Sequence, residues 1–123
     1  MKLHADPHSG QHVVTGLGPG WVAVDGRRYE RSLLLLPDRI DADWGPEMAD
    51  ALTEAHVAVL AALLGKVLLL GTGSRQRFPA ASLLRPLVEA GIGVEVMDTG
   101  AACRTYNVLA AEGRDVAAAL IVE

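Results

Sequence analysis

The most constraining feature of the sequence is the alternation of apolar runs with helix-like segments in its second half. Val67–Leu70 is wholly apolar, as expected of a strand covered on both faces. Two more strands are predicted at Ile92–Met97 and Val116–Val122, and helical spacing of apolar residues occurs at Pro79–Ala90 and Ala101–Glu112. Because crossover helices join parallel strands, two consecutive strand–helix–strand units predict an α/β fold.

Capping residues and spacing predict where the helices begin and end. Thr53 fits an N-cap, and Gly65 should end the first helix. The expected inward face of that helix is Val57, Leu60, Ala61 and Leu64. Pro86 inside Pro79–Ala90 predicts a kink or a later start. The expected inward face of this second helix is Leu83, Leu84, Leu87 and Val88. Thr99 should cap the third helix.

The first third of the chain predicts an antiparallel β meander. Strand-like runs occur at His12–Thr15, Trp21–Val24 and Arg28–Leu36. The segment Leu17–Gly20 separates the first two, and Asp25-Gly26, a strong hairpin signal, separates the second and third. Pro37 should end the meander.

Length and charge bound the class of protein. A chain of 123 residues, half of them hydrophobic, suits a single domain over 1–123. The net charge of −4 argues against nucleic acid, whose phosphates require a basic surface. The longest apolar stretch, Ala55–Leu70, is roughly 16 residues and falls short of the ~20 of a membrane helix. No signal peptide is visible, so we expect a cytoplasmic protein without a transmembrane segment.

The N-terminus carries histidines at a spacing of four: His4, His8 and His12. On a helix this spacing would make a metal-binding face. Pro7 and Gly10 discourage a helix there. We therefore expect residues 1–11 to be a mobile, solvated terminus and predict no metal site.

Polar and glycine residues follow two neighbouring strands, in the segments Gly71–Arg77 and Asp98–Arg104. Ligands of open α/β sheets bind outside the carboxyl ends of the strands, and helix N-termini favour an anion. The candidate ligand-binding residues, with Arg77 as a further cation, are Gly71, Thr72, Gly73, Arg75, Asp98, Thr99, Cys103, Arg104 and Asn107. The alternative is purely structural: the glycines serve tight turns, Asp98 and Thr99 cap a helix, and the arginines are solvated.

Several motifs that would identify a specific cofactor site or enzyme are absent or incomplete, and no cofactor is predicted. The segment Gly71–Gln76 lacks the third glycine of a dinucleotide fingerprint, and no P-loop motif occurs. Asp98-Thr99-Gly100 matches the tripeptide of aspartic proteases, but those enzymes need two such carboxylates and the chain has one copy. Cys103 begins a helix, where a thiol pKa can be lowered, but no histidine is near it in sequence. A small buried core cysteine is the favoured interpretation.

Several segments of the chain together resemble a widespread family of small α/β domains of unknown function. The segments are Leu69–Gly73, Gly91–Thr99, Ala102–Leu109 and Glu112–Arg114. The N-terminal half agrees with that family's hairpins at Gly16, Gly20, Gly26, Tyr29, Ser32, Leu33 and Pro37. The family includes archaeal and bacterial proteins and a mitochondrial assembly factor for respiratory complex I. The resemblance implies a three-layer domain, with a central mixed sheet flanked by helices and an extra β layer.

Two functions from different classes follow. The first is a non-catalytic accessory or assembly protein, acting through its surface on respiratory-complex subunits, as the resemblance implies. The second is a binding protein or enzyme for an anionic metabolite in the crevice between the two loops. The first is favoured because no nucleophile–base pair or metal-ligand cluster is visible in the sequence.

Overall fold

A computed structural model describes residues 10–123. Most of the terminus predicted to be mobile, with His4 and His8, lies outside the described residues. The elements are β1 (Val14–Gly18), β2 (Trp21–Val24), β3 (Arg27–Tyr29), β4 (Leu33–Leu36), β5 (Arg39–Asp41), a 3-10 turn (Ala49–Ala51), α1 (Glu54–Leu60), β6 (Val67–Gly71), α2 (Ala81–Glu89), β7 (Val94–Met97), α3 (Thr99–Ala111) and β8 (Val116–Leu120).

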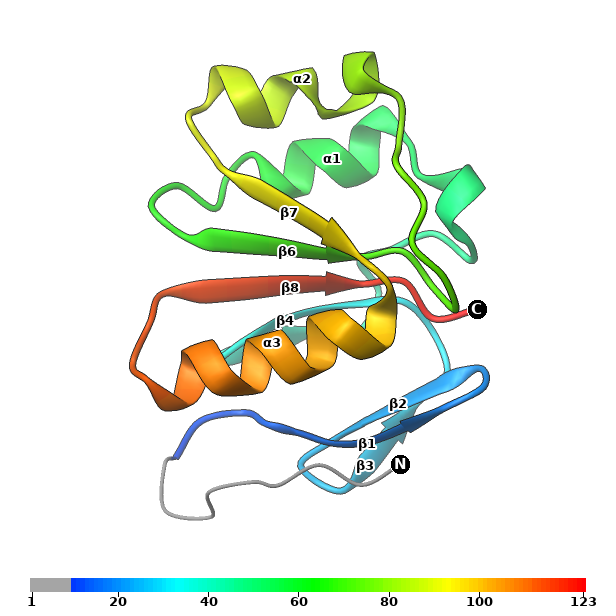
Figure 1. The fold of residues 1–123 in the computed structure, drawn as a ribbon, viewed down its shortest axis with the longest axis vertical. Helices are drawn as coiled ribbons and strands as arrows, with labels where there is room; N and C mark the ends of the chain where they lie inside the picture. The colour runs from blue at the N-terminus through cyan, green and yellow to red at the C-terminus, as the bar shows by residue number, and fades with distance from the viewer. Residues whose placement is uncertain (1–9) are drawn as a thin grey trace.

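The fold is the predicted α/β arrangement in three layers (Figure 1). A five-stranded sheet has the order β5-β4-β8-β6-β7, and a separate antiparallel sheet has the order β1-β2-β3. The strands β7 and β8 both run parallel to β6, whereas β4 runs antiparallel to β8. One face of the large sheet packs on α1 and α2, and the other packs on α3 and the small sheet. No helix within residues 10–123 combines the length and apolarity needed to cross a membrane.

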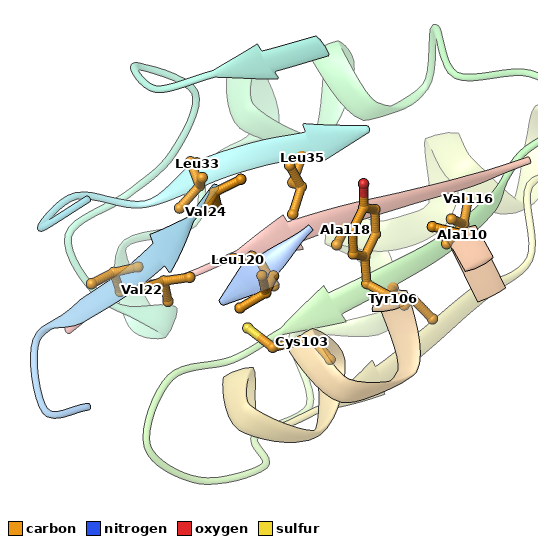
Figure 2. Packing of buried hydrophobic residues seen from close by; sticks show 14 residues of the cluster. Val22, Val24, Leu33, Leu35, Cys103, Tyr106, Ala110, Val116, Ala118 and Leu120 are labelled. Carbon is orange, nitrogen blue, oxygen red and sulfur yellow. The ribbon is translucent and has the colours of Figure 1, made fainter. Parts of the chain in front are cut away.

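The central strands divide their side chains between two cores. In β6, Leu69 contributes to the core under α3, while Leu68 and Leu70 contribute to the core under α1 and α2. The same alternation holds in β8, where Ala118 faces α3 and Ala119 faces the opposite layer. Every residue of β8 is fully buried, so the two apolar runs predicted as central strands are confirmed as such (Figure 2).

The predicted meander is confirmed as three antiparallel strands, but its bounds differ. The first strand continues to Gly18, which pairs with Trp21 across a short turn. The predicted strand Arg28–Leu36 is two strands, β3 and β4, in different sheets. The break falls at Ser32, whose buried hydroxyl bonds the Pro46 carbonyl and accepts from the Val122 N–H. These long-range partners redirect the chain from one sheet to the other.

Pro37 ends β4 as expected, but the chain then forms a hairpin with β5, which the sequence analysis missed. The expected helix ends also shift. The first helix ends at Leu60, because the following turns bond at i+3, and Leu63 rather than Leu64 faces the core. Leu64 is 65% exposed.

The second helix begins later than Pro79, as Pro86 suggested, at Ala81. Its buried stripe centres on Leu87, so Val88, one residue further round the helix, is 71% exposed rather than inward. In the third helix the N-cap is Asp98, and Thr99 is the first helical residue.

We expect Leu69→Asp to abolish cooperative folding. Leu69 is fully buried under α3, and an unpaired buried carboxylate costs several kcal/mol against a total stability of about 5–15 kcal/mol. Thermal melting followed by circular dichroism measures the effect. The matched control is Val108→Asp on the exposed side of α3, where the parent residue is 58% exposed. A sharp melt with an unchanged midpoint for Leu69→Asp would contradict the central position of β6.

Candidate functional site

The two predicted loops lie side by side at one end of the large sheet. The Thr99 N–H donates to the Gly73 carbonyl at 2.9 Å, and the Gly73 N–H donates to Thr99 Oγ1 at 2.8 Å. The Thr99 hydroxyl in turn donates to the Ile121 carbonyl at 2.7 Å. A single buried threonine therefore joins the segments that follow β6 and β8 to the start of α3.

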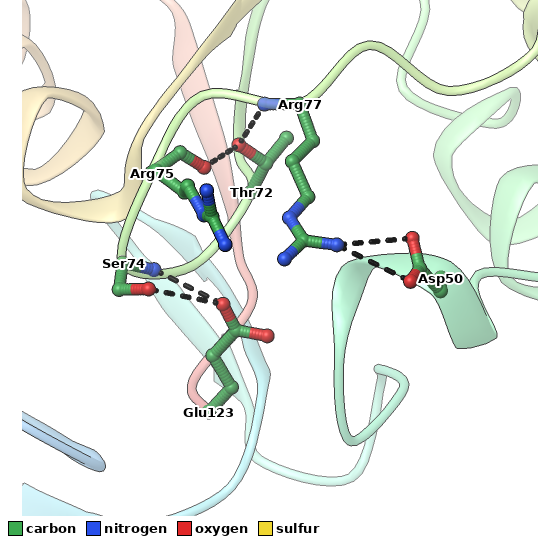
Figure 3. A network of polar contacts seen from close by, with 6 residues as sticks. All are labelled: Asp50, Thr72, Ser74, Arg75, Arg77 and Glu123. Carbon is green, nitrogen blue, oxygen red and sulfur yellow. Dashed lines mark hydrogen bonds and ion pairs between the residues drawn. The ribbon is translucent and has the colours of Figure 1, made fainter.

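The loop after β6 is held by Thr72, which is fully buried. Its hydroxyl donates to the Arg75 carbonyl at 2.8 Å and accepts from the Arg77 N–H at 3.0 Å (Figure 3). The loop continues through residue 80, and α2 begins only at Ala81. Each loop leads into a helix, as predicted, and the first is the longer because Thr72 folds it into a turn of its own.

The N-terminus of α3 already holds an anion of its own. Asp98 adopts an extended backbone conformation, and its Oδ1 accepts from the Ala101 N–H at 2.8 Å. A carboxylate at this position offsets the partial positive charge of the helix end. The predicted role of Asp98 as a cap is therefore present, and it occupies the N–H group that an external anion would use.

The three arginines do not converge on the space between the loops. The Arg77 guanidinium lies 3.2 Å from the Asp50 carboxylate, away from α3 (Figure 3). Arg75 and Arg104 are exposed, and Arg104 extends beside Gly100. None of the three lines the cleft described below.

Cys103 is fully buried in the core between α3 and the sheet, as favoured from the sequence (Figure 2). Burial is the largest influence on this thiol and raises its pKa to about 12, whereas the nearby Arg104 charge lowers it by less. A group that stays protonated and inaccessible at neutral pH is a poor nucleophile. The structure thus places Cys103 in the core rather than in a site.

Asn107 lies about two helical turns beyond the start of α3 and binds the small sheet. Its Oδ1 accepts from the Val14 N–H at 2.9 Å, and its Nδ2 donates to the Val14 carbonyl at 2.8 Å. This pair of bonds imitates a neighbouring strand along the outer edge of β1. The adjacent Tyr106 hydroxyl donates to the His12 carbonyl at 2.7 Å. Asn107 is therefore engaged with β1, at a distance from the predicted crevice.

A cleft of about 390 Å³ lies where the two loops meet the turn between β1 and β2. Gly73, Asp98, Thr99 and Gly100 line the cleft from the two loops. The apolar lining comes from other parts of the chain: Leu17, Pro19, Trp21, Val22, Ile121 and Val122. The sequence analysis missed these residues, because the cleft is made by the small sheet closing over the loops.

Glu123 lines the same cleft and was also missed. Its Oε1 accepts from the Ser74 N–H at 3.2 Å, next to the Ser74 hydroxyl at 3.4 Å (Figure 3). A side chain at Gly73 would collide with this carboxylate, and the Gly73 φ of +99° also favours glycine. Gly73 therefore permits the close approach of the Glu123 carboxylate, whereas the sequence predicted that it would let a ligand approach.

The remaining features to consider at the site are the Trp21 ring and side chains that could bind a metal ion. The Trp21 ring lies against Gly18, where a Cβ would not fit, and the Arg28 guanidinium stacks 3.9 Å from the ring centroid. Among residues 10–123, no group of three or more His, Cys, Asp or Glu side chains is arranged to hold a metal ion.

This arrangement of small sheet, α3 and loops is matched by a known protein family. The family model described as "Protein of unknown function (DUF498/DUF598)" matches residues 14–121. The chain belongs to this family. The resemblance noted in the sequence is thereby confirmed, and the match extends from the first described strand past the last one.

A solved structure and two curated relatives extend the comparison. A crystal structure of a Bordetella parapertussis protein is 38% identical, with a TM-score of 0.84, and covers 95% of this chain and 100% of that one. The complex I assembly factor of Bos taurus, named "NADH dehydrogenase [ubiquinone] 1 alpha subcomplex assembly factor 3", is 35% identical over 100 residues, 80% of this chain and 54% of its own length. A Francisella tularensis protein named "13 kDa major membrane protein" is 31% identical over 71 residues, 58% of each chain.

The chain spans little more than half the length of these two curated relatives. Their names also place relatives in different settings, one a membrane protein and the other an assembly factor. The cytoplasmic location expected from the sequence therefore stays a prediction.

We expect Thr99→Val to lower the free energy of unfolding by about 2–4 kcal/mol, because it leaves the buried Gly73 N–H and Ile121 carbonyl without their partner. Urea denaturation measures this loss. The control is Thr105→Val on the same helix, for which we expect a change within about 0.5 kcal/mol. Equal effects of the two substitutions would show that the Thr99 hydroxyl does not hold the three segments together.

Cys103→Ala should leave the fold intact, with a packing loss of about 1 kcal/mol. Because the thiol pKa is raised to about 12, only about one thiol in ten thousand is ionised at pH 8. We therefore expect a disulfide-based thiol reagent to label the native protein slowly and the urea-unfolded protein at once. Rapid stoichiometric labelling of the native protein would contradict the buried position.

Proposed function

We propose that this chain is a non-catalytic accessory protein that binds a subunit of the respiratory NADH dehydrogenase during its assembly. The observation that carries the proposal is that the polar groups of the two loops are used inside the fold. Thr72, Thr99 and Asp98 each bond backbone groups of their own chain, and Cys103 is buried. These polar groups therefore stabilise the loops and are not arranged as a set of reacting groups.

Sequence similarity to an assembly factor supports the choice of NADH dehydrogenase as the partner. The family of this chain includes an assembly factor for NADH dehydrogenase, and the bovine protein of that name aligns with 80% of the chain. An assembly role needs a surface that recognises a protein, and the mostly apolar lining of the cleft beside the small sheet supports that role.

The alternative remains an anionic metabolite bound between the loops, as a substrate or a ligand. The adjacency of Gly73 and Thr99 favours a binding site at this position. The charge of the site disfavours an anion, because the described residues that line the cleft include two acids, Asp98 and Glu123, and no arginine, lysine or histidine. Protein binding is therefore the function that the geometry supports best.

Deletion of the gene in its native host tests the proposal. We expect less assembled NADH dehydrogenase on native gels stained for NADH oxidation, with unchanged transcripts of its subunits. The wild-type gene and Cys103→Ala should restore assembly, whereas Leu69→Asp, which removes the fold, should not. Undiminished assembly and activity in the deletion strain would refute the assembly role.

A further inference from the structure

Two carboxylates in the cleft each have one oxygen that forms no hydrogen bond within residues 10–123. Asp98 uses Oδ1 to accept from the Ala101 N–H, and Glu123 uses Oε1 to accept from Ser74. Within residues 10–123, no hydrogen bond or ion pair engages Asp98 Oδ2 or Glu123 Oε2. Both side chains line the same cleft, so it presents acceptors and negative charge to whatever enters it.

Among residues 10–123, no cationic side chain forms an ion pair with Asp98 or Glu123, although Arg104 Nη1 lies beside Gly100, near Asp98. Arg77 is paired with Asp50, and the Arg28 guanidinium stacks on the Trp21 ring. Neither arginine lines the cleft, and no ion pair within the described part of the chain involves Asp98 or Glu123. The two carboxylates are therefore open to a positively charged occupant.

The apolar walls of the cleft indicate which uncharged groups accompany the positive charge of the occupant. Leu17, Trp21 and Ile121 provide apolar surface between the carboxylates and the β1–β2 turn. An arginine or lysine side chain combines a charged head with an apolar stem that packs on such walls. Arginine fits better, because its planar fork offers several donors to two carboxylates.

We propose that the cleft binds a basic residue flanked by apolar residues in an exposed segment of a partner protein. The inference rests on the proposed function and names the chemistry of the surface that the partner presents. Asp98 and Glu123 bind the positive charge, while Trp21 and its apolar neighbours cover the stem and the flanking side chains. A volume of about 390 Å³ accommodates one long side chain and part of its neighbours.

A capped leucine–arginine–leucine tripeptide tests the proposal directly. Titration into the full-length protein, followed by ¹H–¹⁵N NMR, should shift the Trp21 indole N–H together with the amides of Ser74 and Gly100. Binding should weaken as salt rises, because the contact is partly exposed. The matched leucine–glutamine–leucine peptide should bind about three- to tenfold more weakly, and the leucine–glutamate–leucine peptide more weakly still.

Conservative variants locate the charge. Asp98→Asn keeps a good N-cap, and Glu123→Gln keeps an acceptor for Ser74, so both variants should fold. Each should weaken binding of the arginine peptide by about three- to tenfold and leave the glutamine peptide unaffected. Asp50→Asn, which removes a carboxylate outside the cleft, is the control and should change neither affinity.

Equal affinity for the three peptides, or affinity unchanged in both cleft variants, would overturn the proposal. Preference for the glutamate peptide, or shifts at residues 71–77 and 98–104 on titration with inorganic phosphate, would overturn it in favour of the anionic ligand. These outcomes leave the proposed function separately testable. Loss of NADH dehydrogenase assembly in the deletion strain would still support an assembly role, with its partner bound elsewhere on the surface.

Discussion

The rest of the structure depends on the close packing of α3 between two sheets. One side of the helix lies on β6 and β8, where Gly71 and the alanines of β8 leave room for its backbone; a Cβ at Gly71 would stand 3.0 Å from the Thr99 Cα. The other side binds β1 through Asn107 and Tyr106. Because only 4% of the residues are aromatic, the core relies on small aliphatic side chains that allow this short separation.

The same packing explains why the polar residues after β6 and β7 serve the fold. A helix that starts directly at the end of β7 leaves its first N–H groups and the neighbouring backbone without partners. Asp98 and Thr99 satisfy these groups from inside the chain. Hydrogen bonds within the chain thereby occupy the edge of the sheet where many α/β proteins bind ligands. The open cleft lies next to the β1–β2 turn instead.

In the role we propose, a cleft bounded by a sheet turn, a capped helix and a carboxylate suits recognition of a protein segment better than chemistry. Its walls are set by backbone: the turn that carries Pro19 and the close approach of Glu123 to Gly73. We expect a mostly apolar surface set by backbone to need little ordering when it binds a partner. In the proposed complex, the charge of Asp98 and Glu123 adds specificity, since an apolar cleft alone discriminates poorly between exposed segments.

By itself, the sequence determined the parallel order of β6 and β7, the buried central strands and the proximity of the two loops, because hydrophobic periodicity and crossover geometry act over short stretches of chain. It also indicated that Cys103 lies in the core. Only the tertiary structure decided that Asn107 binds β1, that β3 and β4 part at Ser32, and that Trp21 and Glu123 close a cleft. These outcomes join residues far apart in sequence, through contacts that exist only in the folded chain.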